Sequence, residues 1–207
     1  MQKSQIQTHL FAPEKRFLDL QDADIEYHPE FIADECAWDL FEHLHKEIDW
    51  RQETIRVYDK SYLVPRLSCW MGDDGLDYAY SNMTMHPVAW NSLVYELLQK
   101  VQTVTEHKFN SVLLNYYRDG QDSVAWHSDD EPELGPNPVI ASLSLGASRD
   151  FHLKHKSKPL QRRCITLEHG SLLLMQGATQ HNWQHQLAKR VEAQGRINLT
   201  FRAIQAC

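Results

Sequence analysis

Two stretches in the first half of the chain repeat their apolar residues at the spacing of an α-helix. Residues 33–48 predict a helix whose apolar face recurs at every fourth position, at Cys36, Leu40, Leu44 and Ile48. A second helix is expected at about 87–105, because Pro87 suits the first helical position. Its apolar stripe consists of Val94, Leu97, Leu98 and Val101. Residues 1–30 are expected to form an irregular arm with short strands at most.

From residue 111 onward, the pattern changes to short runs rich in β-branched and aromatic residues. Gly or Pro separates most of these runs, as at Gly120, Gly146 and Gly170. Several short strands with turns between them indicate a sandwich or barrel. With helices first and strands after, the fold class is α+β, and we expect a double-stranded β-helix (jelly roll) with supporting N-terminal helices. The expected strands are SVLLNYY, SVAWHS, VIASLSL, DFHLKH, RCITLE, SLLLMQ and INLTFR.

Length and composition favour a single globular domain. The chain has 207 residues, of which 42% are hydrophobic and 24% charged, and this is ordinary for a soluble enzyme. The N-terminus lacks the apolar stretch of a signal peptide, and no run is long enough to span a membrane. The four cysteines are far apart, so we expect reduced thiols in a cytoplasmic protein, or a nuclear one in a eukaryote. A net charge of −7 argues against a surface that grips nucleic acid everywhere, but it allows a local basic patch.

The chain contains twelve histidines, which is more than expected for its length, and one lies in a candidate metal motif. His127 and Asp129 are two residues apart, so on a strand both side chains point to the same side. One further histidine would complete the facial triad of non-haem iron(II) oxygenases. His181 and His185, in QHNWQHQL, are both candidates, and spacing alone does not choose between them. An HxD pair on its own is common by chance, so the motif needs support from elsewhere.

The C-terminal run RINLTFR alternates polar and apolar residues. On a strand, its polar residues share one face. Arginines facing a barrel interior would be costly unless they bind an anion, and a dicarboxylate suits guanidinium groups, which grip carboxylates through two hydrogen bonds. The alternative is an ordinary amphipathic strand with a solvated polar face. The polar residues are Arg196, Asn198, Thr200 and Arg202.

Taken together, the HxD pair, a histidine downstream and the RINLTFR run resemble the AlkB family of dioxygenases. The resemblance covers about residues 55–204 and is strongest to the AlkB homologues that repair alkylated DNA in animals and to their bacterial relatives. It implies an enzyme that uses iron(II), 2-oxoglutarate and dioxygen to hydroxylate the alkyl group of a damaged base such as 1-methyladenine or 3-methylcytosine. Formaldehyde, succinate and carbon dioxide would be released. The segments that carry the resemblance are PRLSCWMG, LLNYYRDGQDSVAWHSDDE, IASLSLGASRDF, EHGSLLLM and RINLTFR.

The resemblance also implies roles for individual residues. It identifies His127, Asp129 and His185 as the iron ligands, and it makes His181 a neighbouring loop residue. Just before His185, where relatives often carry a second aromatic residue, this chain has Gln184. The residues expected to bind 2-oxoglutarate are Asn115, Tyr117, Arg196, Asn198 and Arg202.

On the substrate side, the resemblance divides the single domain of residues 1–207 into three parts. These are an N-terminal extension with a helix (1–54), nucleotide-recognition hairpins (55–86), and a helix plus the catalytic jelly-roll core (87–207). An aromatic wedge on a hairpin would offset the stacking that is lost when a base is flipped out, and Tyr58 is expected to be this wedge. The alternatives are a plain surface aromatic for Tyr58 and a surface carboxylate for Glu131. The residues expected to bind substrate are Tyr58, Arg66, Tyr78, Tyr80, Ser81 and Glu131.

Basic residues cluster in two places, both expected at the mouth of the site, where they would contact phosphates. A solvated charged face is the alternative. The expected partner is alkylated DNA, with RNA, a protein or a small molecule as the alternative substrate, and the enzyme would be a monomer with no membrane contact. A catalytically silent binding module would lack a metal ligand or an arginine, and none is missing. The basic residues are Lys154, Lys156, Lys158, Arg162 and Arg163, and then Lys189 and Arg190.

Overall fold

A computed structural model of the chain describes residues 14–57, 59–76, 78–80, 83–85 and 87–205. Its helices are α1 (Asp34–Glu47), α2 (Ser92–Thr105), α3 (Thr179–Asn182) and a short 3-10 helix (Pro132–Leu134). The larger sheet contains β1 (Arg16–Phe17), β2 (Asp24–His28), β5 (Leu67–Gly72), β8 (Ser111–Tyr117), β10 (Ile140–Gly146), β13 (Leu172–Gln176) and β15 (Arg196–Arg202). The smaller sheet contains β9 (Val124–His127), β11 (Arg149–His155), β12 (Arg162–Leu167) and β14 (Trp183–Leu187). Two hairpins pair β3 (Thr54–Val57) with β4 (Lys60–Leu63) and β6 (Tyr78–Tyr80) with β7 (Met83–Met85).

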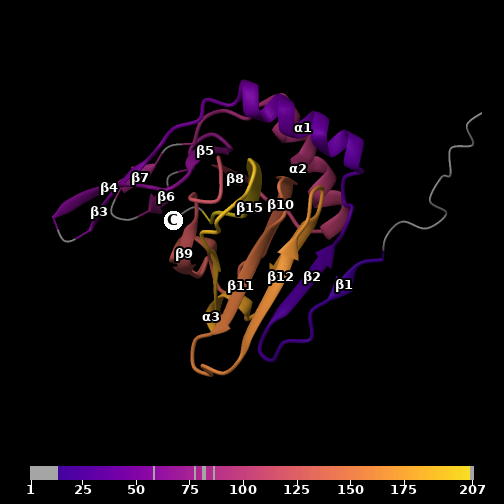
Figure 1. Cartoon of the computed structure of the whole chain (residues 1–207), viewed down its shortest axis with the longest axis vertical. Coiled ribbons are helices and arrows are strands. Elements are labelled where there is room, and N and C mark those ends of the chain that lie inside the picture. Colours follow the sequence, from indigo (N-terminus) through magenta and orange to yellow (C-terminus); the bar gives the residue numbers. More distant parts are fainter. Residues whose placement is uncertain (1–13, 58, 77, 81–82, 86, 206–207) are drawn as a thin grey trace, which may run out of the picture.

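The two sheets form the jelly roll that the sequence predicts. The larger has the order β1-β2-β13-β10-β15-β8-β5 and the smaller the order β12-β11-β14-β9. Most strands pair with strands that are distant in the sequence, and neighbouring strands in both sheets run antiparallel. Helices α1 and α2 cover the outside of the larger sheet, and the β3–β4 and β6–β7 hairpins extend from the molecule on the side of β9 (Figure 1). Each strand predicted from residue 111 onward is present, with ends that differ by at most one residue.

Helix α1 covers the larger sheet with a face that differs from the predicted one. The buried residues of this helix are Ala37, Phe41 and Leu44, whereas Cys36 is exposed and Leu40 is only partly buried. These three buried residues are spaced i, i+4 and i+7. Because a helical turn takes 3.6 residues, this spacing follows one face of the helix more closely than a repeat of four residues does. The predicted face was therefore wrong at Cys36, although the helix itself is confirmed.

Helix α2 begins later than predicted. Its N-cap is Asn91, whose side-chain oxygen accepts hydrogen bonds from the backbone N–H groups of Leu93 (2.9 Å) and Val94 (3.3 Å). These bonds satisfy donors that the first turn leaves without partners. Val88 instead forms a β-bridge with Met71 at the edge of the larger sheet. The placement of Pro87 at the first helical position was wrong, and the predicted stripe, which includes Val94, is confirmed as buried.

Strand β15 separates an apolar layer from a polar one. Ile197, Leu199 and Phe201 belong to the hydrophobic cluster that includes residues of both α1 and α2. The intervening polar residues face the smaller sheet, and they are buried too, since Arg196 is 2% and Asn198 6% exposed. The alternative of a solvated polar face is therefore wrong. A buried polar layer between two sheets is the feature that positions the site.

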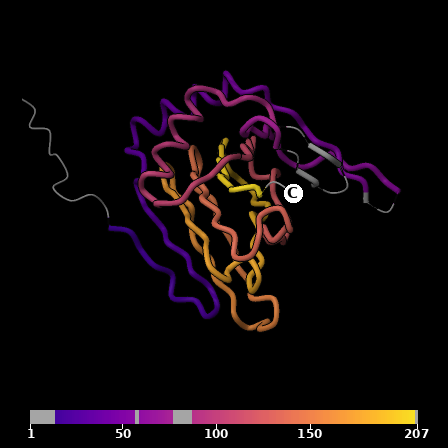
Figure 2. Tube along the Cα trace, turned by 180° about the vertical axis from the view of Figure 1, so that it is seen from behind, coloured from indigo at the N-terminus to yellow at the C-terminus, as the bar shows by residue number. Residues whose placement is uncertain are grey.

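The first 85 residues contribute strands to the larger sheet and form both hairpins. Strand β2 pairs with β13, and β5 pairs with β8, so parts of the predicted extension and of the predicted hairpin region lie in the larger sheet. In Figure 2 the indigo N-terminal strands run beside the orange strands of the C-terminal half. The described helices include none with the length and apolar character that a membrane span needs.

Candidate metal centre and cosubstrate pocket

Three side chains from the smaller sheet converge at its inner face. One ligand atom from each of His127, Asp129 and His185 lies within 4.8 Å of the other two. The Nε2 atoms of the two histidines are 3.1 Å apart, and Asp129 Oδ2 is 3.9 Å from His185 Nε2. His127 and His185 are direct partners across the β9–β14 pair, and Asp129 follows β9 by two residues. This is the only such group of three or more metal-binding side chains among the described residues.

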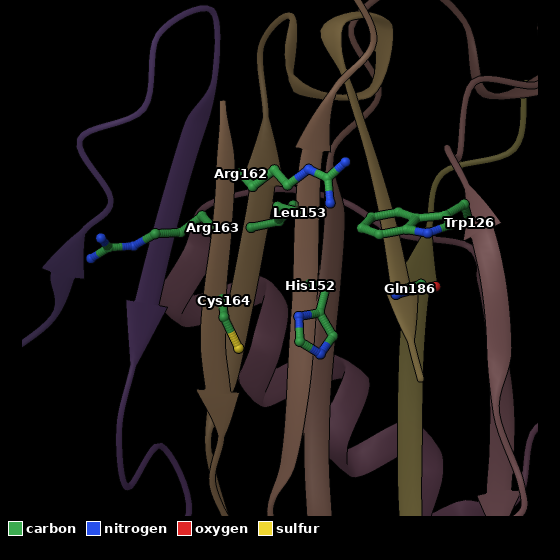
Figure 3. A pocket seen from close by; sticks show the side chains of 7 residues that line it. All are labelled: Trp126, His152, Leu153, Arg162, Arg163, Cys164 and Gln186. Carbon is green, nitrogen blue, oxygen red and sulfur yellow. The ribbon is translucent and has the colours of Figure 1, made fainter. Parts of the chain in front are cut away.

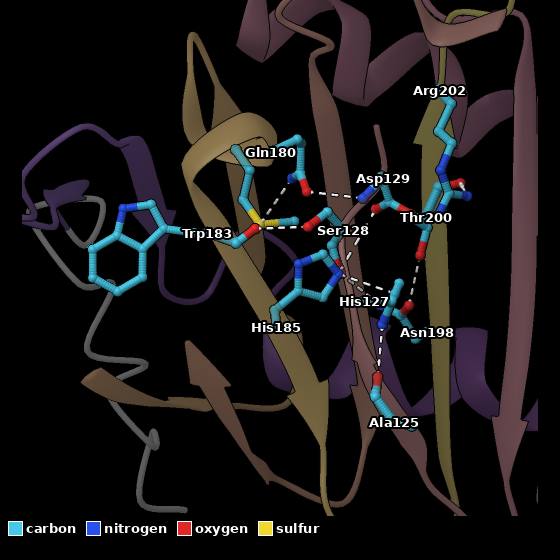
Figure 4. Close-up of polar contacts among 12 residues, drawn as sticks. Ala125, His127, Ser128, Asp129, Gln180, Trp183, His185, Asn198, Thr200 and Arg202 are labelled. Atoms are coloured by element: carbon cyan, nitrogen blue, oxygen red, sulfur yellow. Dashed lines mark hydrogen bonds and ion pairs between the residues drawn. The ribbon is translucent and has the colours of Figure 1, made fainter. Parts of the chain in front are cut away.

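Hydrogen bonds fix the β9 side of the cluster (Figure 4). His127 Nδ1 lies 2.8 Å from the carbonyl oxygen of Ala125, which can only accept. The proton is therefore on Nδ1, and the lone pair of Nε2 points toward the other two ligands. Ser128 donates to the carbonyl of Trp183 (2.9 Å), and the Asp129 N–H donates to the side-chain oxygen of Gln180 (3.0 Å). The end of β9 is thus fixed to β14 and α3.

The charge states of the cluster suit metal binding. Burial and the neighbouring His127 lower the pKa of His185 to about 3, so its imidazole is neutral near pH 7. Burial alone would raise the pKa of Asp129, but the charge of Arg202, with smaller effects from the two histidines, lowers it to about 2. Arg202 donates to Asp129 Oδ1 at 2.8 Å, whereas Oδ2 faces His185. The cluster offers two imidazoles and one carboxylate, the ligand set of a 2-His-1-carboxylate site.

A second polar group lies at the opposite end of β15. The Arg196 guanidinium donates to Ser144 Oγ (2.9 Å), and it lies over the Tyr117 ring at 5.4 Å from the ring centre. Burial lowers the pKa of Arg196 to about 10. No carboxylate forms an ion pair with it in the part of the chain that the structure describes, and its buried Nε atom has no hydrogen-bond partner there. A buried guanidinium without a counter-charge is costly unless an anion binds to it.

The polar layer between these two ends consists of residues that bond to one another. Asn115 and Asn198 are direct partners across β8 and β15. Asn198 uses its amide to donate to Ser142 Oγ (2.8 Å) and to a backbone carbonyl, and its oxygen accepts from Thr200 (2.7 Å). Asn115 accepts a hydrogen bond from Arg66 Nε at 2.8 Å. The structure thus brings the residues predicted to bind 2-oxoglutarate onto one inner face, alongside the histidine cluster.

Comparisons with known proteins agree with this geometry. A family model described as the 2OG-Fe(II) oxygenase superfamily matches residues 24–202. The chain is 41% identical over 214 residues to "Alpha-ketoglutarate-dependent dioxygenase alkB homolog 3" of Mus musculus, across 93% of this chain and 74% of that protein. The chain belongs to the AlkB family of iron(II)- and 2-oxoglutarate-dependent oxygenases. It is also 37% identical over 207 residues to "DNA oxidative demethylase ALKBH2" of Homo sapiens, across 95% of this chain and 79% of that protein.

Solved structures support the fold of this AlkB family member. A structure described as OsALKBH1 superposes with a TM-score of 0.67 at 14% identity, covering 92% of this chain and 100% of that chain. A prolyl-4-hydroxylase from Pseudomonas putida superposes with a TM-score of 0.58 at 13% identity, covering 88% of this chain and 93% of that chain. At such low identity these likenesses concern the fold alone, and they confirm the predicted jelly roll.

The metal and cosubstrate of the AlkB family fit the residues present. The buried cluster supplies the two nitrogens and one oxygen that iron(II) takes from the protein in a facial triad. The orphaned Nε atom of Arg196 supplies a buried donor for an anion such as a carboxylate of 2-oxoglutarate. His181, the other candidate ligand from the sequence, lies outside the cluster, and its Nε2 accepts from the backbone N–H of Asn137 at 3.3 Å.

The residues predicted to bind the substrate base are only partly described. Tyr58 and Ser81 lie outside the described residues, and for Tyr78 and Tyr80 the structure describes the backbone of β6 alone. Glu131 directly precedes the 3-10 helix, two residues after Asp129. Arg66 already has protein partners, because it donates a hydrogen bond to Asn115 and its Nη1 lies 3.4 Å from the carbonyl oxygen of Ser123. The substrate roles of these residues stay predictions.

The predicted phosphate-binding residues have different surroundings. Lys156 pairs with Asp130 at 2.8 Å, and Lys158 pairs with Asp22 at 2.5 Å. Lys154 lies over the ring of Trp126. The remaining members of the two clusters, Arg162, Arg163, Lys189 and Arg190, are exposed. Two of the lysines therefore have their charge offset, and the other cations form no ion pair within the part of the chain that the structure describes.

Sequence reasoning missed a buried residue that supports the cosubstrate pocket. Arg149 is 1% exposed and donates to the carbonyls of Asp119, Asp122 and Ala188, at 3.3, 3.1 and 2.7 Å. Its guanidinium also lies 5.9 Å from the centre of the Tyr117 ring. Tyr117 is thus in contact with the guanidinium groups of Arg149 and Arg196. The only sequence signal was an arginine at the start of an alternating strand pattern, on the same face as Phe151 and Leu153.

Proposed function

We propose that the protein oxidatively removes small alkyl groups from nucleic-acid bases, with alkylated DNA as its substrate. The observation that carries this proposal is the pairing on one inner face of a buried His127–Asp129–His185 cluster with a buried arginine that lacks a counter-charge. Relatives within the AlkB family that carry the name DNA oxidative demethylase support the choice of DNA. The protein would act as a monomer in the compartment that holds the DNA, which is the cytoplasm, or the nucleus in a eukaryote.

In this proposal, the cluster holds iron(II) and keeps its own ligands deprotonated. His127 is fixed with its proton on Nδ1, His185 is neutral because it is buried, and Asp129 is ionised because Arg202 stabilises its charge. Asp129 divides its two oxygens, since Oδ1 accepts from Arg202 and Oδ2 faces the histidines. Iron with 2-oxoglutarate and dioxygen supplies the oxidation of the alkyl group when bound.

Arg196 binds and orients the dicarboxylate in this proposal. Its guanidinium is held on one side by Ser144 and on another by the Tyr117 ring, so it is preorganised for a charged group. Because the pocket is buried, an ion pair formed there is stronger than the same pair in water. The strands that carry this polar layer pack on two hydrophobic clusters, which limit the access of water and so protect the reaction from side reactions with solvent.

The experiment that tests the proposal measures formaldehyde and succinate together. Anaerobically iron-loaded protein is mixed with 2-oxoglutarate, ascorbate, air and an oligonucleotide that carries one 1-methyladenine. We expect formaldehyde equal in amount to the methylated base consumed, and none from the unmethylated oligonucleotide. Succinate without formaldehyde would contradict DNA dealkylation but retain the oxygenase chemistry, and RNA, protein and small-molecule substrates would then be compared.

Two histidines provide a matched pair of variants for the same assay. His185→Ala removes a ligand of the cluster and should abolish iron binding and succinate formation. His181→Ala removes a histidine four positions earlier in the sequence, whose ring accepts a hydrogen bond from a backbone N–H, and should bind iron as the wild type does. Equal effects of the two changes would contradict the assignment of the cluster.

A further inference from the structure

The outer face of the smaller sheet carries a hollow of about 380 Å³, on the side away from the metal centre. Its walls come from all four strands of the sheet. Trp126 of β9 stands at one side, Arg162 and Cys164 of β12 at the other, and His152 and Gln186 lie between them (Figure 3). The hollow has the size of a small-ligand site, which is roughly 300–1,000 Å³.

Strand alternation separates this hollow from the metal centre. His185 and Leu153 are direct partners on the inner face, so their neighbours Gln186 and His152, which also pair, point outward. In the same way His127 points inward and Trp126 outward. One sheet therefore carries the candidate metal centre on one face and the hollow on the other.

The cations around the hollow lack the counter-charges that their neighbours have. The ammonium of Lys154 lies 4.3 Å from the centre of the Trp126 ring, and Lys154 is the direct cross-strand partner of Arg162. Among the described residues, no carboxylate forms an ion pair with either of them, whereas Lys156 and Lys158 pair with Asp130 and Asp22.

A carboxylate is present on the same face but is engaged elsewhere. Asp150 lies four residues before Lys154 on β11 and accepts a hydrogen bond from the Thr166 hydroxyl at 3.0 Å. Two adjacent uncompensated cations on a chain of net charge −7 indicate an anionic partner for this surface.

We propose that the outer hollow, meaning Trp126 and Arg162 of its lining together with the neighbouring Lys154, binds an unpaired nucleic-acid strand next to the reacting base. One base stacks on the Trp126 indole, and the two cations contact the phosphates beside that base. An aromatic platform with flanking cations is the usual composition of a single-strand site, because every base has a face that can stack. The proposal rests on the proposed function, since it concerns the same substrate beyond the pocket.

The topology provides a path between the two sites. Strand β9 is the edge of the smaller sheet, so no further strand of that sheet covers its outer side. His127 and Trp126 are neighbours on β9 and lie on opposite faces of the sheet. A single-stranded nucleic acid that leaves the pocket at His127 can therefore pass around this edge and reach Trp126. A duplex does not suit the outer hollow in the same way, because its bases are already stacked on one another.

The test measures binding of metal-free, full-length protein to fluorescein-labelled single strands by anisotropy. Each strand carries one 1-methyladenine, with a flank on one side that is lengthened stepwise. We expect wild-type affinity to rise with flank length and then level off. Trp126→Ala should weaken binding of the long strand by about tenfold, which is within the range for loss of one stacked base, and Trp126→Phe should restore most of it. Trimers carrying the same base should bind the variants and the wild type equally.

Charge variants separate a specific contact from general attraction. Lys154→Gln and Arg162→Gln should each reduce the slope of log affinity against log salt by about 0.7, the value for one phosphate contact with a single strand. Lys158→Gln removes the same charge from a paired lysine, and Lys46→Gln removes it from α1, where it pairs with Glu42. Neither of these should change the slope.

Three results would overturn the proposal. The first is that Trp126→Ala binds the long strand as tightly as the wild type does. The second is that Trp126→Ala loses as much affinity for a blunt duplex of the same sequence as for the single strand. The third is that Lys158→Gln changes the salt slope as much as Lys154→Gln does. Failure of the proposed function has a different signature, because wild-type protein would then release no formaldehyde from the methylated strand, whatever the binding of the variants.

Discussion

The two ends of strand β15 carry an arginine each, and the two guanidinium groups have opposite surroundings. Arg202 donates to the carboxylate of Asp129 at 2.8 Å. Arg196 donates to the hydroxyl of Ser144 and lies over the ring of Tyr117, and its burial lowers its pKa to about 10. Among the described residues, one arginine has a carboxylate as its partner and the other has none. The same residue type at two ends of one strand can thus serve two purposes, one internal and one directed at a ligand.

The physical cause of the difference lies in the smaller sheet. Asp129 reaches β15 because it lies two residues after the end of β9 that faces Arg202. The other end faces the hydroxyl of Ser144 and the ring of Tyr117. A protein loses stability when one partner of a buried ion pair is removed, because the other charge stays buried without compensation. A buried charge without a partner can be replaced by an apolar residue with no such loss. Replacing the arginine by methionine at each end should therefore change the stability of the protein in opposite directions.

The largest expected effect comes from the carboxylate that distinguishes the two ends. Asp129→Ala should reduce succinate formation on the order of a thousandfold or more, as is typical when an essential group is removed. Iron binding, measured by equilibrium dialysis, should be lost with it. Asp130→Ala is the matched control, since it removes the adjacent carboxylate, which pairs with Lys156, and should retain iron binding. Normal turnover by pure Asp129→Ala protein would exclude this residue as a ligand.

Arg196→Met is the next largest expected change, and it acts on the end without a counter-charge. We expect the affinity for 2-oxoglutarate to fall about a hundredfold, because truncating one partner of a buried charge pair costs 2–5 kcal/mol or more. The melting temperature of the protein without 2-oxoglutarate should stay the same or rise, since a buried uncompensated charge is removed. Calorimetric titration with manganese(II) in place of iron measures the affinity.

A conservative variant sharpens the same experiment. Arg196→Lys keeps the positive charge but lacks the planar fork that binds a carboxylate through two hydrogen bonds. It should bind 2-oxoglutarate more weakly than the wild type and more tightly than Arg196→Met. Unchanged affinity in both variants would mean that the dicarboxylate is held elsewhere.

Arg202→Met should have the opposite effect on stability. It leaves Asp129 buried without its arginine, and the free energy of unfolding should fall by roughly 3 kcal/mol. Chemical denaturation of the metal-free protein measures this directly. If Arg196→Met and Arg202→Met shift the stability in the same direction by the same amount, the difference between the two ends of β15 has no energetic meaning.

The alternation of RINLTFR predicted that these arginines share a buried face, and the buried positions confirm that part. The sequence could not separate their surroundings, because Asp129 and Arg202 are 73 residues apart and meet only through the packing of two sheets. The same limit applies to Lys154 and Lys156, which look alike in the chain. Their partners, Trp126 and Asp130, depend on the register between β9, β11 and β14.

Local signals were sufficient for the strands that were predicted from residue 111 onward, but they missed β14, which carries His185, and they were insufficient for some helical details. Each run of β-branched and aromatic residues became a strand, since turn residues marked its ends. The start of α2 was misplaced because Pro87 and Asn91 both favour a helix start, and only the bridge of Val88 to Met71 decides between them. Arg149 was missed because its partners are backbone carbonyls of distant loops, for which no residue type is a signal.

The smallest expected effect comes from the hydroxyl that holds Arg196. Ser144→Ala removes the hydrogen bond at 2.9 Å that orients its guanidinium, and a hydrogen bond to a charged group is worth about 1.5–3 kcal/mol. We expect the affinity for 2-oxoglutarate to fall several-fold, less than for Arg196→Met, because the charge remains. Ser142→Ala is the matched control on the same strand, since Ser142 bonds to Asn198 and not to an arginine. If Ser142→Ala weakens 2-oxoglutarate binding as much as Ser144→Ala does, the polar layer acts as one unit and Arg196 has no special place in it.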